Sequence, residues 1–193
     1  MEELLRQLRD LPEQFVVLTI LPADGHKTAN MDILRMLTQE RGHHGAYVSV
    51  NHPYISLLRE FQRAGVDHTK LFFIDCVSSR AGDEDNVVYL KSIESLTNLS
   101  ISLEPLYKHE GISFILIDSL DAFTIYHDST TVIKFCRAMI ERIREHEKCG
   151  IMVGLHEDTD RWIIDELSLV CDSVIDMTDG SRRSARNPRE ERR

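Results

Sequence analysis

The sequence has few cysteines, and they form neither a disulfide pattern nor a metal-binding pattern. Cys76, Cys136, Cys149 and Cys171 are far apart, with no CxxC pair and no histidine at metal-ligand spacing. Most of them lie in or beside apolar segments, where a free cysteine behaves as a small hydrophobic residue. The sequence therefore indicates neither a disulfide framework nor a zinc site.

Long apolar runs, internal repeats and linkers rich in glycine or proline are also missing. No apolar run approaches the roughly 20 residues that span a bilayer, and the first residues do not have the layout of a signal peptide. We therefore expect a cytoplasmic protein without membrane contact. With 193 residues and no linker, we expect one domain over residues 1–179, whose first helix lies in residues 1–12.

Positive charge is scarce except in one segment. The formal net charge is −9, yet residues 180–193 hold six arginines against two glutamates, a local charge of +4, which leaves −13 for the rest. Such an acidic body argues against a broad nucleic-acid surface, so we expect nucleic-acid contact only through the basic tail. We expect the tail itself to be disordered and solvated.

Short apolar runs alternate with amphipathic helical patterns along the whole chain. Apolar residues on both faces of such runs are typical of a parallel sheet that is covered on both sides. We therefore predict an α/β fold, doubly wound, with a mainly parallel central sheet and helices on both faces. The predicted strands are 15–21, 46–50, 71–76, 111–120, 150–155 and 173–177, with a short apolar patch at 87–90. The predicted helices are 2–11, 54–64, 93–108, 130–147 and 161–170, with one more after the turn at 22–28.

The central apolar run, residues 111–120, ends in an acidic residue, Asp118. An acidic side chain at the carboxyl end of such a strand lies where open α/β sheets bind their ligands. In nucleotide hydrolases of the P-loop class, such an aspartate helps to hold magnesium. The alternative is that Asp118 only ends the strand and caps the next turn. Asp75, at the end of another predicted strand, is a second candidate for the same reason.

The turn after the first predicted strand partly matches the phosphate-binding motif GxxxxGK[ST]. In that motif the glycines let backbone N–H groups wrap the phosphates, the lysine reaches the β- and γ-phosphates, and the hydroxyl contacts magnesium. Lys27 and Thr28 fit the last two positions, but Leu21 and His26 replace the glycines, and Gly25 is displaced by one position. A β-carbon at residue 26 crowds a loop that phosphates must approach closely. The turn is either an eroded phosphate loop or an ordinary turn with Thr28 as helix cap and Lys27 in solvent.

The order of these segments resembles the KaiC-like branch of the RecA superfamily of ATPases. The resemblance extends from about Phe15 to Met177. It is carried by Lys27-Thr28 at the Walker A position, by the second strand at 46–50, by 114–120 as a Walker B strand, and by 171–175, which is similar to the closing segment of the family. It implies a RecA-like P-loop NTPase fold and suggests an archaeal source.

The resemblance also implies roles for individual residues. Gly25, His26, Lys27 and Thr28 match the segment that binds the phosphates of ATP or ADP in the family. Thr28 and Asp118 match the positions that hold Mg²⁺.

The residues that activate water in the family differ in this chain. Relatives end the second strand with one or two glutamates, whereas this chain has Asn51 and His52. An asparagine cannot take up a proton, so the remaining catalytic candidates are His52 and Glu157, which follows the strand predicted at 150–155.

These observations lead to three functional hypotheses. The main one is a RecA/KaiC-like domain with an eroded P-loop that acts as a nucleotide-binding or pseudo-ATPase regulatory or scaffold subunit. The alternative is an active Mg-dependent ATPase with an atypical Walker A loop, and the third is a domain that binds another small ligand at the same strand ends. The cofactor is ATP or ADP with Mg²⁺, or there is none. Members of the superfamily assemble side by side, so the resemblance implies a protein partner or a homo-oligomer.

Overall fold

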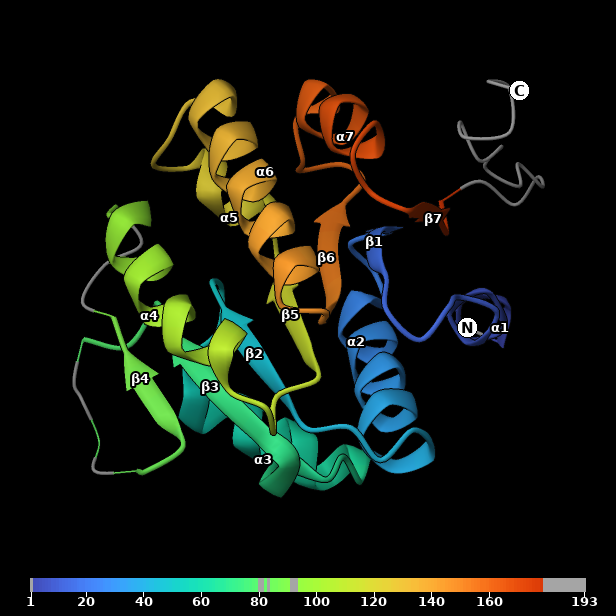
Figure 1. The fold of residues 1–193 in the computed structure, drawn as a ribbon, viewed down its shortest axis with the longest axis vertical. Helices are drawn as coiled ribbons and strands as arrows, with labels where there is room; N and C mark the ends of the chain where they lie inside the picture. The colour runs from blue at the N-terminus through green and yellow to red at the C-terminus, as the bar shows by residue number, and fades with distance from the viewer. Residues whose placement is uncertain (1, 80–81, 83, 91–93, 179–193) are drawn as a thin grey trace.

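The computed structural model describes residues 2–79, 82, 84–90 and 94–178. Seven strands form one sheet in the order β4-β3-β2-β5-β6-β1-β7, and every neighbouring pair is parallel (Figure 1). The strands are β1 (Val16–Leu21), β2 (Gly45–Ser49), β3 (Leu71–Asp75), β4 (Val87–Tyr89), β5 (Phe114–Asp118), β6 (Cys149–Leu155) and β7 (Ser173–Asp176). The predicted parallel α/β fold is confirmed.

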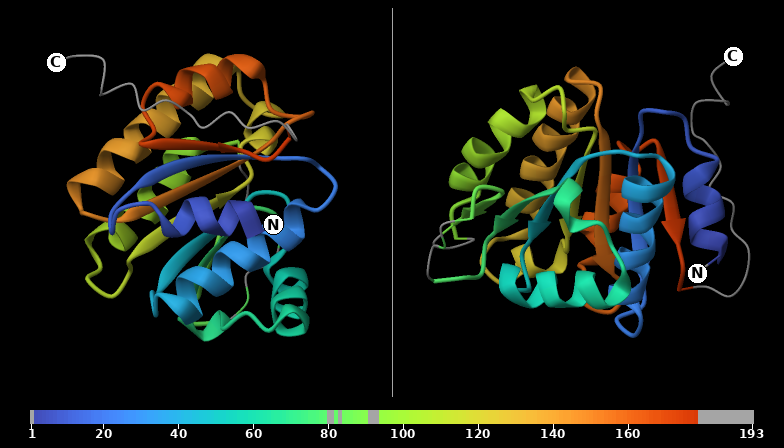
Figure 2. Two further views of the ribbon diagram at one scale, coloured as in Figure 1. Left: turned by 90° about the vertical axis from the view of Figure 1, so that its right-hand side faces the viewer. Right: turned by 90° about the horizontal axis from the view of Figure 1, so that it is seen from below.

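Helices cover both faces of this sheet. One face packs against α1, α2 and α3, and the other against α4, α5, α6 and α7 (Figures 1 and 2). Their bounds are α1 (Glu2–Arg9), α2 (His26–Arg35) with its π-helical extension η1 (Met36–Glu40), α3 (Tyr54–Ala64), the 3₁₀ turn η2 (His68–Lys70), α4 (Leu96–Lys108), α5 (Asp121–Thr124), α6 (Ser129–Glu145) and α7 (Arg161–Ser168). No helix in these described segments is long and apolar enough to cross a bilayer.

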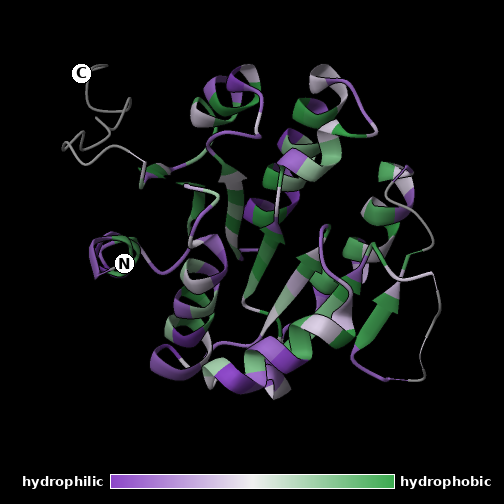
Figure 3. Cartoon of the chain, turned by 180° about the vertical axis from the view of Figure 1, so that it is seen from behind, coloured by the Kyte–Doolittle hydropathy of each residue, from purple (hydrophilic) through white to green (hydrophobic). Residues whose placement is uncertain are grey.

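Side chains of each central strand alternate between two separate cores. On β1, Val16 and Leu18 belong to the core under α4–α7, whereas Val17 and Leu21 belong to the core under α1–α3. Successive side chains of a strand point to opposite faces, so a strand covered on both sides must be apolar throughout. Figure 3 shows this pattern as strands that are mainly coloured as hydrophobic.

Three local features differ from the prediction. The interpretation of Thr28 as a helix cap is wrong, because α2 begins at His26, directly after Gly25. Gly25 has φ of 94°, a left-handed conformation that glycine adopts without steric cost, and this starts the helix earlier. The short helix α5 was not predicted, and the apolar patch at 87–90 forms the edge strand β4. The predicted disordered tail, residues 180–193, lies outside the described residues.

The carboxyl ends of all strands meet at one edge of the sheet because all strands are parallel. The pairing registers align Asp75 with Ser49, and Ser49 with Asp118, across the ends of β3, β2 and β5. Only β6 separates β5 from β1. The turn after β1 and the end of β5 therefore lie along the same edge, where doubly wound sheets bind ligands.

Candidate functional site

The turn between β1 and α2 is short and closed by a side chain. Leu21, at the first glycine position of the motif, is still part of β1, and its carbonyl accepts a 2.9 Å hydrogen bond from the His156 backbone N–H. The His26 ring folds back so that Nδ1 lies 2.9 Å from the Ala23 carbonyl oxygen. The side chain of His26 thus bridges the turn that the motif would use to surround a phosphate.

A small cavity of about 180 Å³ lies beside this turn. Its walls come from α1, the turn, the start of α2 and the residue after β7. The lining residues are Leu4, Leu21, Pro22, Asp24, Gly25, His26, Ala29 and Met177.

Lys27 extends from the start of α2 toward α3. Its Nζ lies 3.3 Å from Oε1 of Glu60, and its side chain is about half exposed, at 47%. Thr28, one residue further along, is exposed. The two residues that match the end of the motif therefore face α3 and the solvent.

Asp118 is buried under α2, with 3% of its surface exposed. The hydroxyl of Tyr47 on β2 donates a hydrogen bond to Oδ2 of Asp118, whereas Oδ1 has no partner in the described part of the chain. Burial raises the pKa of Asp118, and the hydrogen bond from Tyr47 opposes that rise only in part. Burial and the nearby charge of Asp118 raise the pKa of Tyr47 well above its usual value. This environment favours the protonated form of both groups.

Asn30 completes this buried polar group. It lies on α2 with 1% of its surface exposed and is close enough to Tyr47 and Asp118 for its side chain to lower the pKa of both, although neither its side-chain oxygen nor its nitrogen makes a hydrogen bond of normal geometry to a described residue. Buried polar atoms usually find partners, so the region between α2 and the end of β5 has unused hydrogen-bonding capacity.

The turn after β2 is held to the strand ends by polar contacts. The Ser49 hydroxyl donates to the His52 carbonyl at 2.5 Å, and the Asn51 side-chain amide donates to the Ser119 hydroxyl at 3.0 Å. Burial and then the positive charge of Lys27 lower the pKa of His52. The neutral imidazole, which can accept a proton, is therefore the favoured form.

Asp75 has a different environment from Asp118, although both end a strand. Its carboxylate accepts hydrogen bonds from the backbone N–H groups of Tyr54 at 2.7 Å, Val77 at 2.8 Å and Ser78 at 2.9 Å. These bonds occupy its lone pairs, so Asp75 anchors the two loops that follow β2 and β3.

The structure brings together some of the predicted site residues but not all. The positive charge of Lys27 lowers the pKa of His52 and the negative charge of Asp118 raises it, so these three predicted residues influence one another electrostatically. Glu157 is exposed in the loop after β6. Within the described segments, no group of three or more His, Cys, Asp or Glu side chains could hold a metal ion.

Sequence reasoning missed Tyr47 and Asn30. Tyr47 carried a signal, because a tyrosine inside a buried strand needs a hydrogen-bond partner for its hydroxyl. Asn30 lies three residues after Lys27 and is a polar residue on the apolar side of a helix, which is a weaker signal.

Comparison with known proteins identifies the family. A family model described as "ATPase: KaiC" matches residues 33–191. The chain belongs to the KaiC ATPase family. The match begins within α2, after the turn and after Lys27 and Thr28 in the first turn of that helix. No curated protein matches the chain.

Two solved structures from Pyrococcus horikoshii share the fold. The KaiC-like protein PH0186 from strain OT3 is similar with a TM-score of 0.62 and 17% identity, over 86% of this chain and 73% of that one. The uncharacterized protein PH0321, in complex with an unknown peptide, is similar with a TM-score of 0.61 and 15% identity, over 91% of this chain and 82% of that one. The predicted resemblance to KaiC-like proteins is thus confirmed.

Proposed function

We propose that this KaiC-family chain does not turn over ATP and acts as a regulatory or scaffold subunit through a protein partner or a second copy of itself. The observation that carries this proposal is the ion pair between Lys27 and Glu60, 3.3 Å apart, because it directs the lysine toward α3 and away from the turn. A phosphate-binding lysine must instead extend along its loop to the β- and γ-phosphates.

A magnesium–nucleotide complex fits this arrangement poorly. Leu21 and His26 take the place of the two glycines, and the His26 ring lies against the Ala23 carbonyl across the turn. Thr28 is exposed, whereas Asp118 is buried and bonded to Tyr47, so the two expected magnesium ligands differ in their access to solvent. Asn51 and His52 replace the glutamates that activate water in the family. These residues therefore do not support a hydrolytic step in this chain.

Binding of a protein partner has some support from the comparisons. The PH0321 structure contains an unknown peptide, and that protein shares this fold. A fold that evolved around a nucleotide can keep its surface for partners after the site has changed, because the scaffold and the site are separate properties.

The decisive test combines thermal unfolding with a turnover assay. Wild type and Lys27→Ala are heated without nucleotide, with Mg-ATP and with Mg-ADP, and ATP hydrolysis is measured for both. A ligand at ~100 times its Kd stabilises the folded state by about 2.7 kcal/mol, which such a measurement resolves. We expect no shift and no turnover, and we expect any partner to co-purify equally with and without nucleotide.

The second candidate, a Mg-dependent ATPase, is favoured by one observation: Oδ1 of Asp118 makes no hydrogen bond of normal geometry to any residue that the structure describes. A nucleotide-dependent shift together with turnover, both lost in Lys27→Ala but kept in Lys134→Ala, would overturn the proposal. Lys134 is a suitable control because it is an exposed lysine on α6, on the other face of the sheet.

A further inference from the structure

Exposed apolar side chains gather where two loops meet at the carboxyl edge of the sheet. Ile125 and Tyr126, between α5 and α6, are 72% and 52% exposed, and Trp162, at the start of α7, is 48% exposed. The Ser129 hydroxyl donates a hydrogen bond to the Asp160 carboxylate, which joins the start of α6 to the start of α7. Tyr126 and Trp162 lie within three residues of this bond and therefore belong to one surface.

The same surface is acidic. Glu157 and Asp158, in the loop between β6 and α7, are exposed and form no ion pair with any residue that the structure describes. Arg161, the nearest arginine or lysine to them in the sequence, is paired with Asp165 at 3.7 Å. We call the surface formed by Ile125, Tyr126, Glu157, Asp158 and Trp162 the aromatic–acidic edge. It combines aromatic faces with uncompensated negative charge, a chemistry that suits arginine.

The arginine-rich segment, residues 180–193, follows the last strand, which ends near this edge. The Met177 backbone N–H, directly after β7, donates a hydrogen bond to the Ile20 carbonyl on β1. On the other side of β1, Leu21 pairs with Leu155 at the end of β6. The end of β7 is therefore two strands away from His156, the residue after β6. Neighbouring strands lie about 4.8 Å apart, which puts Met177 roughly 10 Å from the loop of Glu157. The described part of the chain therefore ends, at Thr178, near the loop that contributes Glu157 and Asp158 to the aromatic–acidic edge.

The sequence of that segment complements the edge in charge and length. Residues 180–193 carry six arginines and two glutamates, a net charge of +4, against an acidic body. At about 3.3 Å per extended residue, this segment reaches roughly 45 Å, several times the distance to Glu157. Arginine stacks on tyrosine and tryptophan faces while its guanidinium pairs with carboxylates.

We propose that residues 180–193 dock on the aromatic–acidic edge of the same chain. Arginines of the segment stack on Tyr126 and Trp162 and pair with Glu157 and Asp158. The docked segment covers the exposed apolar side chains, and a stronger partner for this surface must first displace it. This inference does not depend on whether the chain binds or hydrolyses ATP.

Trp162 provides a direct readout because it is the one tryptophan of the sequence. Its fluorescence emission and its quenching by acrylamide are compared between the full chain and a chain that ends at Thr178. Docking predicts that removal of residues 179–193 shifts the emission to longer wavelengths and increases quenching. About 1 M salt, at which the Debye length falls to about 3 Å, should move the full chain toward the same values and leave the shortened chain unchanged. Far-UV circular dichroism verifies that both chains are folded.

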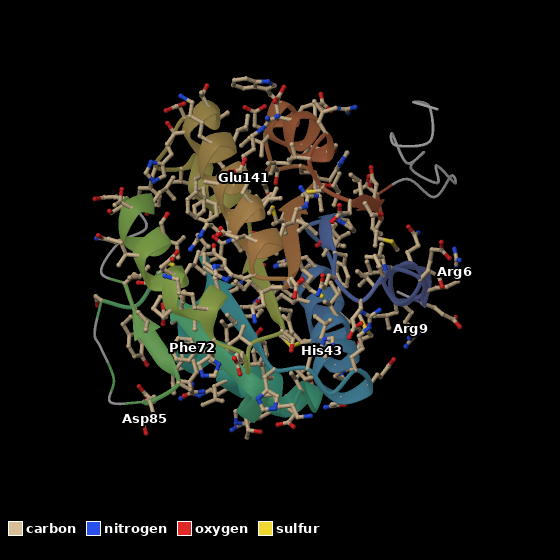
Figure 4. The ribbon with its side chains drawn as sticks, in the orientation of Figure 1. Arg6, Arg9, His43, Phe72, Asp85 and Glu141 are labelled. Atoms are coloured by element: carbon tan, nitrogen blue, oxygen red, sulfur yellow. The ribbon has the colours of Figure 1, made fainter. Side chains whose placement is uncertain are left out.

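Charge reversal tests the location of the docking surface. In the full chain, Glu157→Lys with Asp158→Lys should reproduce the effect of removing the segment. The control, Glu110→Lys with Glu141→Lys, makes the same charge change at exposed positions away from the edge and should leave the fluorescence unchanged; Figure 4 labels Glu141 on α6. In the shortened chain, the Glu157/Asp158 variant should add no further change, because effects that act through one contact are not additive.

Two results would overturn the proposal. Equal emission and quenching for the full and shortened chains would mean that residues 179–193 do not cover Trp162. A difference that grows with protein concentration would assign the segment to the edge of a second copy instead of its own chain.

Discussion

The hydroxyl of Tyr47 on β2 donates a hydrogen bond to the carboxylate of Asp118 on the neighbouring strand β5, and both side chains are buried. This contact ties together two residues that are 71 positions apart in the sequence. It gives the aspartate at the end of β5 a partner from within the protein.

Tyr47→Phe should destabilise the fold. The substitution removes the donor to Asp118 and leaves its buried oxygen without a partner, which costs about 1–3 kcal/mol. Urea unfolding at pH 7 measures the change. Tyr107→Phe is the matched control: Tyr107 is also buried, its hydroxyl bonds to no described side chain, and its loss should change stability by less than about 0.5 kcal/mol. Equal effects of the two substitutions would contradict a bond between Tyr47 and Asp118.

Asp118→Asn should stabilise the protein at neutral pH. Burial raises the pKa of Asp118 in the folded state above its value in the unfolded chain, so the folded state holds this proton more tightly. The contribution of Asp118 to stability is therefore fully present below an unfolded pKa of about 3.9 and is lost as the pH rises through the folded pKa.

The asparagine variant lacks this titration. Its advantage over wild type should be absent at low pH and should grow as the pH rises above about 4. Unfolding free energies of both proteins, measured from acidic to neutral pH, give this difference directly. An advantage that does not change with pH would argue against a raised pKa.

Asp75→Asn should have the opposite effect, although Asp75 also ends a strand. Its carboxylate accepts backbone hydrogen bonds from Tyr54, Val77 and Ser78. An amide NH₂ group would face some of these N–H donors, and the loss should be about 3 kcal/mol. Denaturation of this variant beside Asp118→Asn compares two chemically identical changes. Stabilisation by both would show that the hydrogen bonds to Asp75 contribute little.

Gly45→Ala should destabilise the centre of the sheet. A β-carbon at Gly45 would lie 2.3 Å from ring atoms of Phe114 on β5, so the rings and strands must shift. Overpacking of this kind costs about 1–3 kcal/mol.

Gly150→Ala is the control within the same sheet. There the nearest atom would be a terminal methyl carbon of Ile143 at 3.0 Å, which can move more easily, so the loss measured by thermal or urea unfolding should be smaller. A larger loss at Gly150 would contradict the packing around Phe114.

The sequence by itself determined the class of the fold. Apolar runs on both faces require a sheet covered on both sides, and the alternation of strands with helical patterns makes that sheet parallel. The sequence also placed Asp75 and Asp118 at strand ends, because polar residues there interrupt an apolar run. The order of the segments carried the resemblance to the KaiC-like proteins, which the family match confirmed.

Only the tertiary structure decided what each of these residues contacts. Lys27 and Thr28 are adjacent in the sequence, but their directions depend on where α2 begins, and that depends on the left-handed conformation of Gly25. The partners Glu60 and Tyr47 come from distant segments that the sheet brings near. Local patterns describe the surroundings of a residue along the chain, whereas hydrogen bonds and burial depend on neighbours in space. For this reason Asp75 and Asp118 look alike in the sequence and differ in the fold.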